Sequence, residues 1–106
     1  MKEIEGQLWI ENIPVINLAR EYGSPIFIYS VEQIKSNFGK YQNEVGSNDL
    51  ICYAVKANSN LHIIKLLSEL GSGFDVVSGN ELKRCLKVGA DTVSYTHLRA
   101  HETFAN

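Results

Sequence analysis

The chain has 106 residues, of which 44% are hydrophobic and 21% charged, and its net charge is −2 at pH 7. This length suits one small domain and is too short for two. The small net charge gives no reason to expect nucleic acid or an anionic membrane as a partner. No apolar run approaches the roughly 20 residues that span a bilayer, and the acidic N-terminus does not resemble a signal peptide. We therefore expect a cytoplasmic protein.

The first half of the chain predicts two helices and two strands. Residues 7–10 are a short strand candidate. Residues 14–22 predict a helix, because proline suits a first helical turn and Gly23 can end the helix. Residues 25–29 are nearly all apolar, which is typical of a strand buried on both faces. A capping-box pattern opens residues 30–44 and predicts a second helix there.

The second half alternates strands and helices. Residues 50–55 and 73–77 predict buried strands. Asn60 can cap the helix that follows the first strand, and Ser78 with Glu81 forms a capping box after the second. Such alternation with short connections favours parallel strands covered by helices, as in a barrel or a doubly wound sheet. Two such units cannot close an eight-stranded barrel, so the architecture is incomplete.

The chain gives little support for a metal site. Cys52 and Cys85 are too few and too far apart for a disulfide framework or a zinc site, and we expect small buried residues in a reducing compartment. His97 and His101 are four residues apart and could share a helix face. The zinc-protease pattern, however, requires glutamate directly after the first histidine, where this chain has Leu98. We expect no metal ion.

Residues 92–106 do not continue the pattern of the preceding chain. They begin where a third strand should start but lack the apolar run that a buried strand requires. They resemble a sequencing-library adapter translated in frame. We therefore exclude them from the fold and expect the native sequence to stop near Asp91.

Lys56 is the main candidate for chemistry. It stands where an apolar strand ends and an asparagine-rich turn begins. If its neighbours remove the amine from water, the pKa of the amine falls and a lone pair becomes available to attack a carbonyl. A lysine at a strand end is otherwise a solvated surface charge, so its context must decide.

Three stretches resemble the alanine-racemase-like, barrel-type pyridoxal-phosphate enzymes. Residues 53–58, Tyr-Ala-Val-Lys-Ala-Asn, resemble the cofactor-lysine motif. Residues 71–82 resemble the segment that follows this motif in the decarboxylase branch, and residues 18–29 resemble the opening of diaminopimelate decarboxylases. Together they cover most of residues 9–91 in the expected order. The serine and asparagine that follow the motif argue against a racemase.

The resemblance implies an α/β fold, namely a partial (β/α)8 barrel with parallel strands. Residues 1–91 would form the N-terminal part of a pyridoxal-phosphate-binding barrel domain, and residues 92–106 a non-native tail. Lys56 would be the catalytic residue that bonds to pyridoxal 5'-phosphate. Ala54 would let the cofactor ring lie close to the strand. Asp75 would hold the lysine or stabilise a protonated amine, unless it is a loop acid satisfied by backbone donors.

The resemblance also implies a function for the full-length parent. It would be a homodimer that decarboxylates an amino-acid substrate, meso-2,6-diaminopimelate, to L-lysine. A related ornithine- or arginine-type decarboxylase, a non-catalytic carrier of the cofactor and a plain small α/β protein remain open alternatives. The phosphate-binding loop and the acid at the ring nitrogen are missing, so we expect the 106-residue chain to be inactive. Glu81 also fits the family, but its capping role explains it without catalysis.

Overall fold

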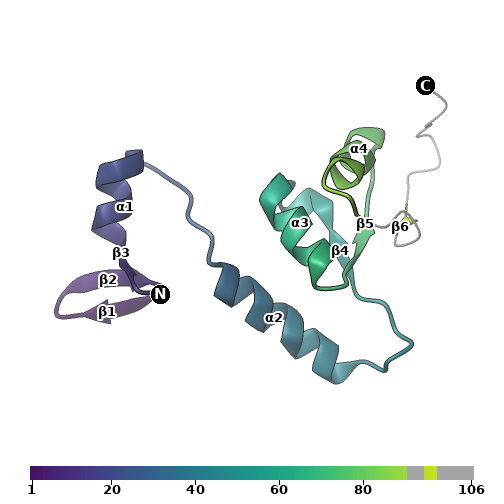
Figure 1. The fold of residues 1–106 in the computed structure, drawn as a ribbon, viewed down its shortest axis with the longest axis horizontal. Coiled ribbons are helices and arrows are strands. Elements are labelled where there is room, and N and C mark those ends of the chain that lie inside the picture. Colours follow the sequence, from purple (N-terminus) through teal and green to yellow (C-terminus); the bar gives the residue numbers. More distant parts are fainter. Residues whose placement is uncertain (91–94, 98–106) are drawn as a thin grey trace. The chain divides into compact units, whose positions relative to one another are not determined.

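The computed structural model describes residues 1–90 and 95–97, and the chain divides into two compact units, Met1–Asn37 and Phe38–Asn106. In the first unit, three short strands form an antiparallel sheet and lead into a helix (Figure 1). These elements are β1 (Lys2–Ile4), β2 (Gln7–Ile10), β3 (Ile13–Pro14) and α1 (Val15–Tyr22). The strand predicted over residues 7–10 and the helix predicted over residues 14–22 are confirmed.

Two tight turns build this sheet. Ile4 pairs with Gln7, and Ile10 pairs with Ile13, so each connection is only two residues long. The residues of both turns have positive φ angles, as two-residue hairpins commonly require. Strands β1 and β3 were not predicted from the sequence, although Gly6 in the first turn is the kind of residue that marks such a hairpin.

The strand predicted over residues 25–29 is wrong. This segment belongs to no sheet, and the side chains of Phe27 and Tyr29 are 91% and 50% exposed. An apolar strand is stable only when neighbouring strands pair with its backbone and other elements cover its faces. The described residues supply neither to this segment, so an apolar pattern alone was not sufficient to place it in a sheet.

Helix α2 (Val31–Glu44) begins where the capping-box pattern predicted. The backbone N–H of Gln33 donates to the hydroxyl oxygen of Ser30 over 3.1 Å. The side chain of Gln33 does not return to the start of the helix but donates to Asn37 Oδ1 over 2.9 Å. Only one half of the predicted capping box is therefore formed.

The second unit contains a parallel sheet in the order β4 (Cys52–Ala54), β5 (Gly73–Asp75) and β6 (Tyr95–His97). Helices α3 (Leu61–Glu69) and α4 (Gly79–Lys87) follow β4 and β5 (Figure 1). This arrangement confirms the predicted α/β pattern with parallel strands. Strands β4 and β5 are shorter than the ranges 50–55 and 73–77 that the sequence predicted. At the carboxyl end of β4, Val55 already belongs to the 3-10 turn η1 (Val55–Ala57).

Strand β6 lies within the segment that the sequence analysis excluded from the fold. Its backbone pairs with β5, where Phe74 is opposite Tyr95 and Asp75 is opposite His97. The other residues of the tail, 92–94 and 98–106, lie outside the described residues. That residues 92–106 are non-native stays a prediction.

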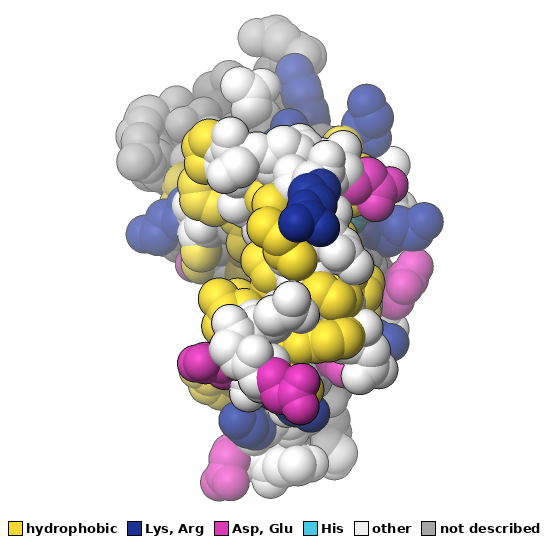
Figure 2. Space-filling view, turned by 90° about the vertical axis from the view of Figure 1, so that its left-hand side faces the viewer, with side chains coloured by type: hydrophobic (Ala, Val, Ile, Leu, Met, Phe, Trp, Pro, Cys, Tyr) yellow, Lys and Arg dark blue, Asp and Glu magenta, His cyan; other side chains and the backbone are white. Residues whose placement is uncertain are grey.

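The buried side chains lie mostly in the second unit. Its most deeply buried members are almost inaccessible to solvent: Val55, Ile64, Phe74, Val76 and Cys85. Among described residues 1–37, Ile10 is the only buried hydrophobic side chain, and apolar side chains are open to solvent over the N-terminal elements (Figure 2). No helix in the part of the chain that the structure describes is long and apolar enough to cross a membrane.

Candidate active site at the carboxyl ends of β4 and β5

Lys56 is the second residue of η1, which begins directly after Ala54, the last residue of β4. The first residue of this turn, Val55, is fully buried in the core, whereas Lys56 is exposed. The structure therefore differs from the expectation that neighbouring side chains remove the amine from water. Within the part of the chain that the structure describes, Lys56 is an exposed residue and can be reached from solvent.

Asp75 ends β5 beside the turn that carries Lys56. In the parallel register Ala54 is opposite Asp75, so the carboxyl ends of both strands lie side by side at the same end of the sheet. The Oδ1 atom of Asp75 is buried and has no hydrogen-bond partner among the described residues. A buried carboxylate oxygen without a donor is costly. It indicates a site that is completed by another group, and for this oxygen it argues against satisfaction by backbone donors.

Together these residues fit pyridoxal phosphate. Lys56 presents an amine, and Asp75 presents a carboxylate oxygen that lacks a donor among the described residues. The half-buried Ala54, opposite Asp75 in the register, adds only a methyl group. In barrels of alternating strands and helices, active sites form at the carboxyl ends of the strands, which is this edge. The structure thus brings the three residues predicted from the sequence to the same edge of the sheet.

The turn after Lys56 is organised by hydrogen bonds that the sequence analysis did not identify. The Tyr53 hydroxyl donates to the carbonyl oxygen of Asn58 over 2.8 Å. The Asn58 side chain accepts from the N–H of Asn60 over 3.0 Å. Asn60 in turn caps α3 by accepting from the N–H of His62 over 2.9 Å, as predicted. The asparagines were the available signal, since asparagine side chains often bond to backbone two residues on.

One contact to this turn comes from the second strand–helix pair. The Nε–H of Arg84 on α4 donates to the carbonyl oxygen of Ser59 over 2.8 Å. The two residues are 25 positions apart, so no local pattern could have revealed the contact. Arg84 was missed in the sequence analysis for that reason.

Glu81 takes part in capping α4, as predicted, but its side chain bonds to the N–H of Val77 and not to that of Ser78, which a full capping box would use. Its N–H donates to the Ser78 hydroxyl oxygen over 3.2 Å, and its Oε1 accepts from the N–H of Val77 over 3.0 Å.

Burial of the side chain, and secondly the charge of Glu81, raise the pKa of the Cys85 thiol to about 11. Cys85 is thus the inert buried thiol that the sequence predicted, while Cys52 is half-buried.

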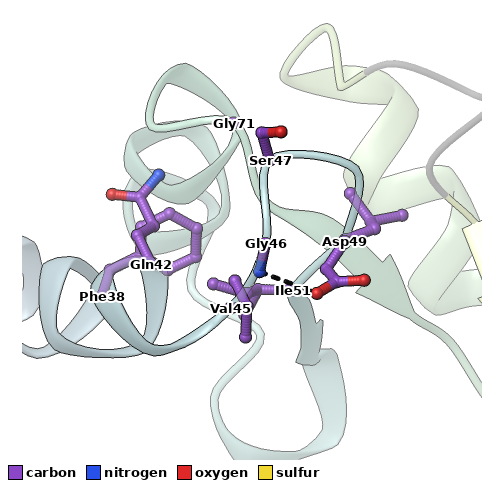
Figure 3. Close-up of a pocket in the computed structure, with 9 residues that line it drawn as sticks. Phe38, Gln42, Val45, Gly46, Ser47, Asp49, Ile51 and Gly71 are labelled. Atoms are coloured by element: carbon purple, nitrogen blue, oxygen red, sulfur yellow. Dashed lines mark hydrogen bonds between the residues drawn. The ribbon is translucent and has the colours of Figure 1, made fainter.

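A hollow of about 360 Å³ lies at the opposite end of this sheet, where the strands begin. It is lined by residues that precede β4 and β5, among them Phe38, Ile51 and Gly71 (Figure 3). The N–H of Gly46 donates to Asp49 Oδ2 over 2.8 Å and closes the turn beside it (Figure 3). Because this hollow is at the amino ends of the strands, it is separate from Lys56 and Asp75.

The described residues contain no group of three or more histidine, cysteine, aspartate or glutamate side chains that could hold a metal ion. Of the two histidines considered for a metal pair, His101 lies outside the described residues, and only the backbone of His97 is described.

The chain belongs to the pyridoxal-dependent decarboxylases, because residues 31–101 match the family described as "Pyridoxal-dependent decarboxylase, pyridoxal binding domain". This match begins at α2, includes Lys56 and Asp75, and extends past Asp91. A diaminopimelate decarboxylase of Vibrio cholerae is 48% identical over 88 residues, which cover 82% of this chain and 21% of that protein.

Solved structures agree with this family. A crystal structure of a protein from Aquifex aeolicus matches with a TM-score of 0.89 and 40% identity over 96% of this chain and 25% of the other. A diaminopimelate decarboxylase from Methanocaldococcus jannaschii matches with a TM-score of 0.81 and 34% identity over 91% of this chain and 24% of the other. The partial-barrel fold is thereby confirmed. The chain spans about a fifth of the length of the curated relatives that it matches.

Proposed function

We propose that the whole protein is a diaminopimelate decarboxylase, which converts meso-2,6-diaminopimelate to L-lysine and carbon dioxide. The observation that carries this proposal is the arrangement at one sheet edge, where an exposed lysine follows β4 and an unpartnered carboxylate oxygen ends β5. The substrate is inferred from the curated relatives, which are named for this reaction at up to 48% identity.

The roles of the three site residues follow from their positions. Pyridoxal phosphate, when bound, supplies an electron sink for the charge left on carbon when carbon dioxide departs. Lys56 holds the cofactor covalently, and its exposed amine is accessible to the cofactor's carbonyl. Asp75 accepts a hydrogen bond through Oδ1 and so favours a protonated nitrogen beside it. Ala54 leaves room for the flat ring.

The remaining assignments concern the whole protein. Residues 1–91 are proposed as the N-terminal part of the barrel domain and residues 92–106 as a non-native tail. A homodimer in the cytoplasm is the expected form of the parent. Sequencing the gene beyond codon 91 tests whether residues 92–106 are non-native. A sequence that continues the barrel with a glycine-rich loop would support a non-native tail, and a stop codon directly after Asn106 would contradict it.

The full-length gene product offers a direct test of the reaction. Incubation with pyridoxal phosphate and meso-diaminopimelate, ornithine or arginine should release carbon dioxide only with diaminopimelate, and lysine should accumulate. Lys56→Ala should lower kcat by at least about a thousandfold, because it removes the covalent attachment. Lys65→Ala is the matched control, since Lys65 is an exposed lysine on α3 and should leave kcat unchanged.

Each alternative gives a different result in the same assay. Turnover of ornithine or arginine in place of diaminopimelate would assign the protein to a related decarboxylase. Covalent attachment of the cofactor to Lys56 without turnover of any substrate would indicate a non-catalytic carrier. Full activity of the Lys56→Ala variant would contradict the site itself.

A further inference from the structure

The turn that follows Lys56 is held from two directions. Residues 58–60 connect η1 to α3, and the hydrogen bonds of Tyr53, Asn58 and Asn60 fix this turn to its own strand and helix. Arg84 approaches from α4, which belongs to the next strand–helix pair, and donates to the Ser59 carbonyl oxygen over 2.8 Å. This distance is at the short end for a hydrogen bond from nitrogen, as expected when the donor is charged.

The position of α4 gives this contact its significance. Helix α4 is capped by Ser78, only three residues after Asp75, so its start is fixed relative to the end of β5. Arg84 therefore connects the helix that follows Asp75 with the turn that follows Lys56. Both Arg84 and Ser59 are exposed, so we expect the hydrogen bond to add little to global stability.

We propose that Arg84 is a positioning residue of the cofactor site, which sets the turn carrying Lys56 against the strand end carrying Asp75. This inference rests on the proposed function, because it assumes that Lys56 bonds to pyridoxal phosphate. Arginine suits the role, since its guanidinium stays charged at all physiological pH values and offers a rigid, directional donor.

Reductive labelling of Lys56 measures this role without any turnover. The apo form of the full-length protein is titrated with pyridoxal phosphate, reduced with borohydride, and the pyridoxyl group on Lys56 is quantified by mass spectrometry. Arg84→Met should raise the cofactor concentration for half-maximal labelling about tenfold, which corresponds to about 1.4 kcal/mol. Lys83→Met is the matched control: it removes an exposed positive charge from the same helix and should change the midpoint less than twofold.

A double-mutant cycle separates positioning from a general loosening of the fold. If Arg84 acts by placing Lys56 against Asp75, the tenfold effect of Arg84→Met should fall below about threefold in an Asp75→Asn background, because coupled residues are not additive. Arg84→Lys, which keeps a cationic donor, should label within about threefold of the unsubstituted protein. If the Met variant does not fold, the Lys variant and a Gln variant, each in both backgrounds, provide the same comparison.

The outcomes are distinguishable from failure of the proposed function. No label on Lys56 in the unsubstituted protein would overturn the proposed function and this inference together. Labelling of the unsubstituted protein with the same midpoint in Arg84→Met and Lys83→Met would overturn the inference alone. So would an undiminished tenfold effect in the Asp75→Asn background, since Arg84 would then act independently of Asp75.

Discussion

The two units of the chain differ in how far they bury their own apolar side chains. The second unit encloses Phe74, Ile64 and Cys85 almost completely between its sheet and helices. In the first unit, α1 has no buried residue, and most large apolar side chains from Met1 to Val31 remain exposed. Both units nevertheless have regular strands and helices. Local sequence signals were thus sufficient to form elements in both units, but only the second unit packs them around a core.

This difference bears on function, because every residue assigned to the site belongs to the second unit. Ala54, Lys56 and Asp75 lie on two paired strands or directly after them, with a packed core beneath. A cofactor site requires such rigid support, since its groups must be held in a fixed geometry. The first unit offers no comparable support among the described residues, since most of its large apolar side chains are exposed.

Substitution of one phenylalanine in each unit should give the largest difference in stability between the two units. Phe74 is fully buried in the second unit, and Phe27 is 91% exposed in the first. In the full-length protein, Phe74→Ala should lower the free energy of unfolding by about 3–5 kcal/mol, because it leaves a cavity. Phe27→Ala should change it by less than about 0.5 kcal/mol if the rest of the protein leaves this ring in solvent. Denaturant unfolding monitored by circular dichroism measures both values.

A large loss of stability from Phe27→Ala would show that this ring is covered in the whole protein. That result would sharpen the comparison, since the first unit would then depend on other protein surface for its core. Equal small losses from both substitutions would contradict the packing described for the second unit.

The two cysteines test whether the core of the second unit stays closed. Because burial raises the pKa of the Cys85 thiol to about 11 from an ordinary value of 9.0, the thiol remains protonated at pH 8. Cys52 is half-buried, so a thiol reagent should modify it at least about tenfold faster than Cys85. Liquid chromatography and mass spectrometry of native and urea-unfolded samples would give both rates, and equal native rates would contradict a closed core.

The same thiol has a defined effect on stability. A pKa that is higher in the folded state means that folding favours the neutral thiol. Its contribution to stability is therefore complete below about pH 9 and is lost as the pH rises from about 9 to about 11. Replacement by serine, which does not ionise in this range, should remove this alkaline dependence from unfolding curves.

Removal of a helix cap from each unit should give the smallest difference in unfolding free energy. Ser78 and Ser30 are both half-buried, but the hydrogen bond by which Ser78 caps α4 is partly buried, whereas the one by which Ser30 caps α2 is exposed. Ser78→Ala should cost about 1 kcal/mol of unfolding free energy and Ser30→Ala about 0.5 kcal/mol. Thermal unfolding of the two variants beside Ser→Thr controls would measure the difference. A larger loss at Ser30 would contradict the view that the more buried cap contributes more.

The sequence predicted the second unit well because its signals are local. The caps at Asn60 and Ser78 set where the helices start, and the apolar runs located β4 and β5 but not β6. Parallel pairing of the two strands was then sufficient to bring Lys56 and Asp75 to one edge. The positions of these residues along the chain thus carried most of the information about the site.

Other features depend on contacts that no local pattern records. The exposure of Phe27 reflects the absence of pairing strands among the described residues, which an apolar run cannot report. The contact of Arg84 with Ser59 joins residues 25 positions apart. The unpartnered oxygen of Asp75 became visible only once the burial of that atom and its surroundings were known.

The most direct test of the account is the location of the covalent bond to the cofactor. The full-length protein is incubated with pyridoxal phosphate, reduced with borohydride, digested and mapped by mass spectrometry. The account predicts one pyridoxyl group, on the peptide that contains Lys56, and its loss in Lys56→Arg. Specific labelling of another lysine, such as Lys65 or Lys87, or no labelling at all would contradict the assignment of Lys56 as the cofactor lysine.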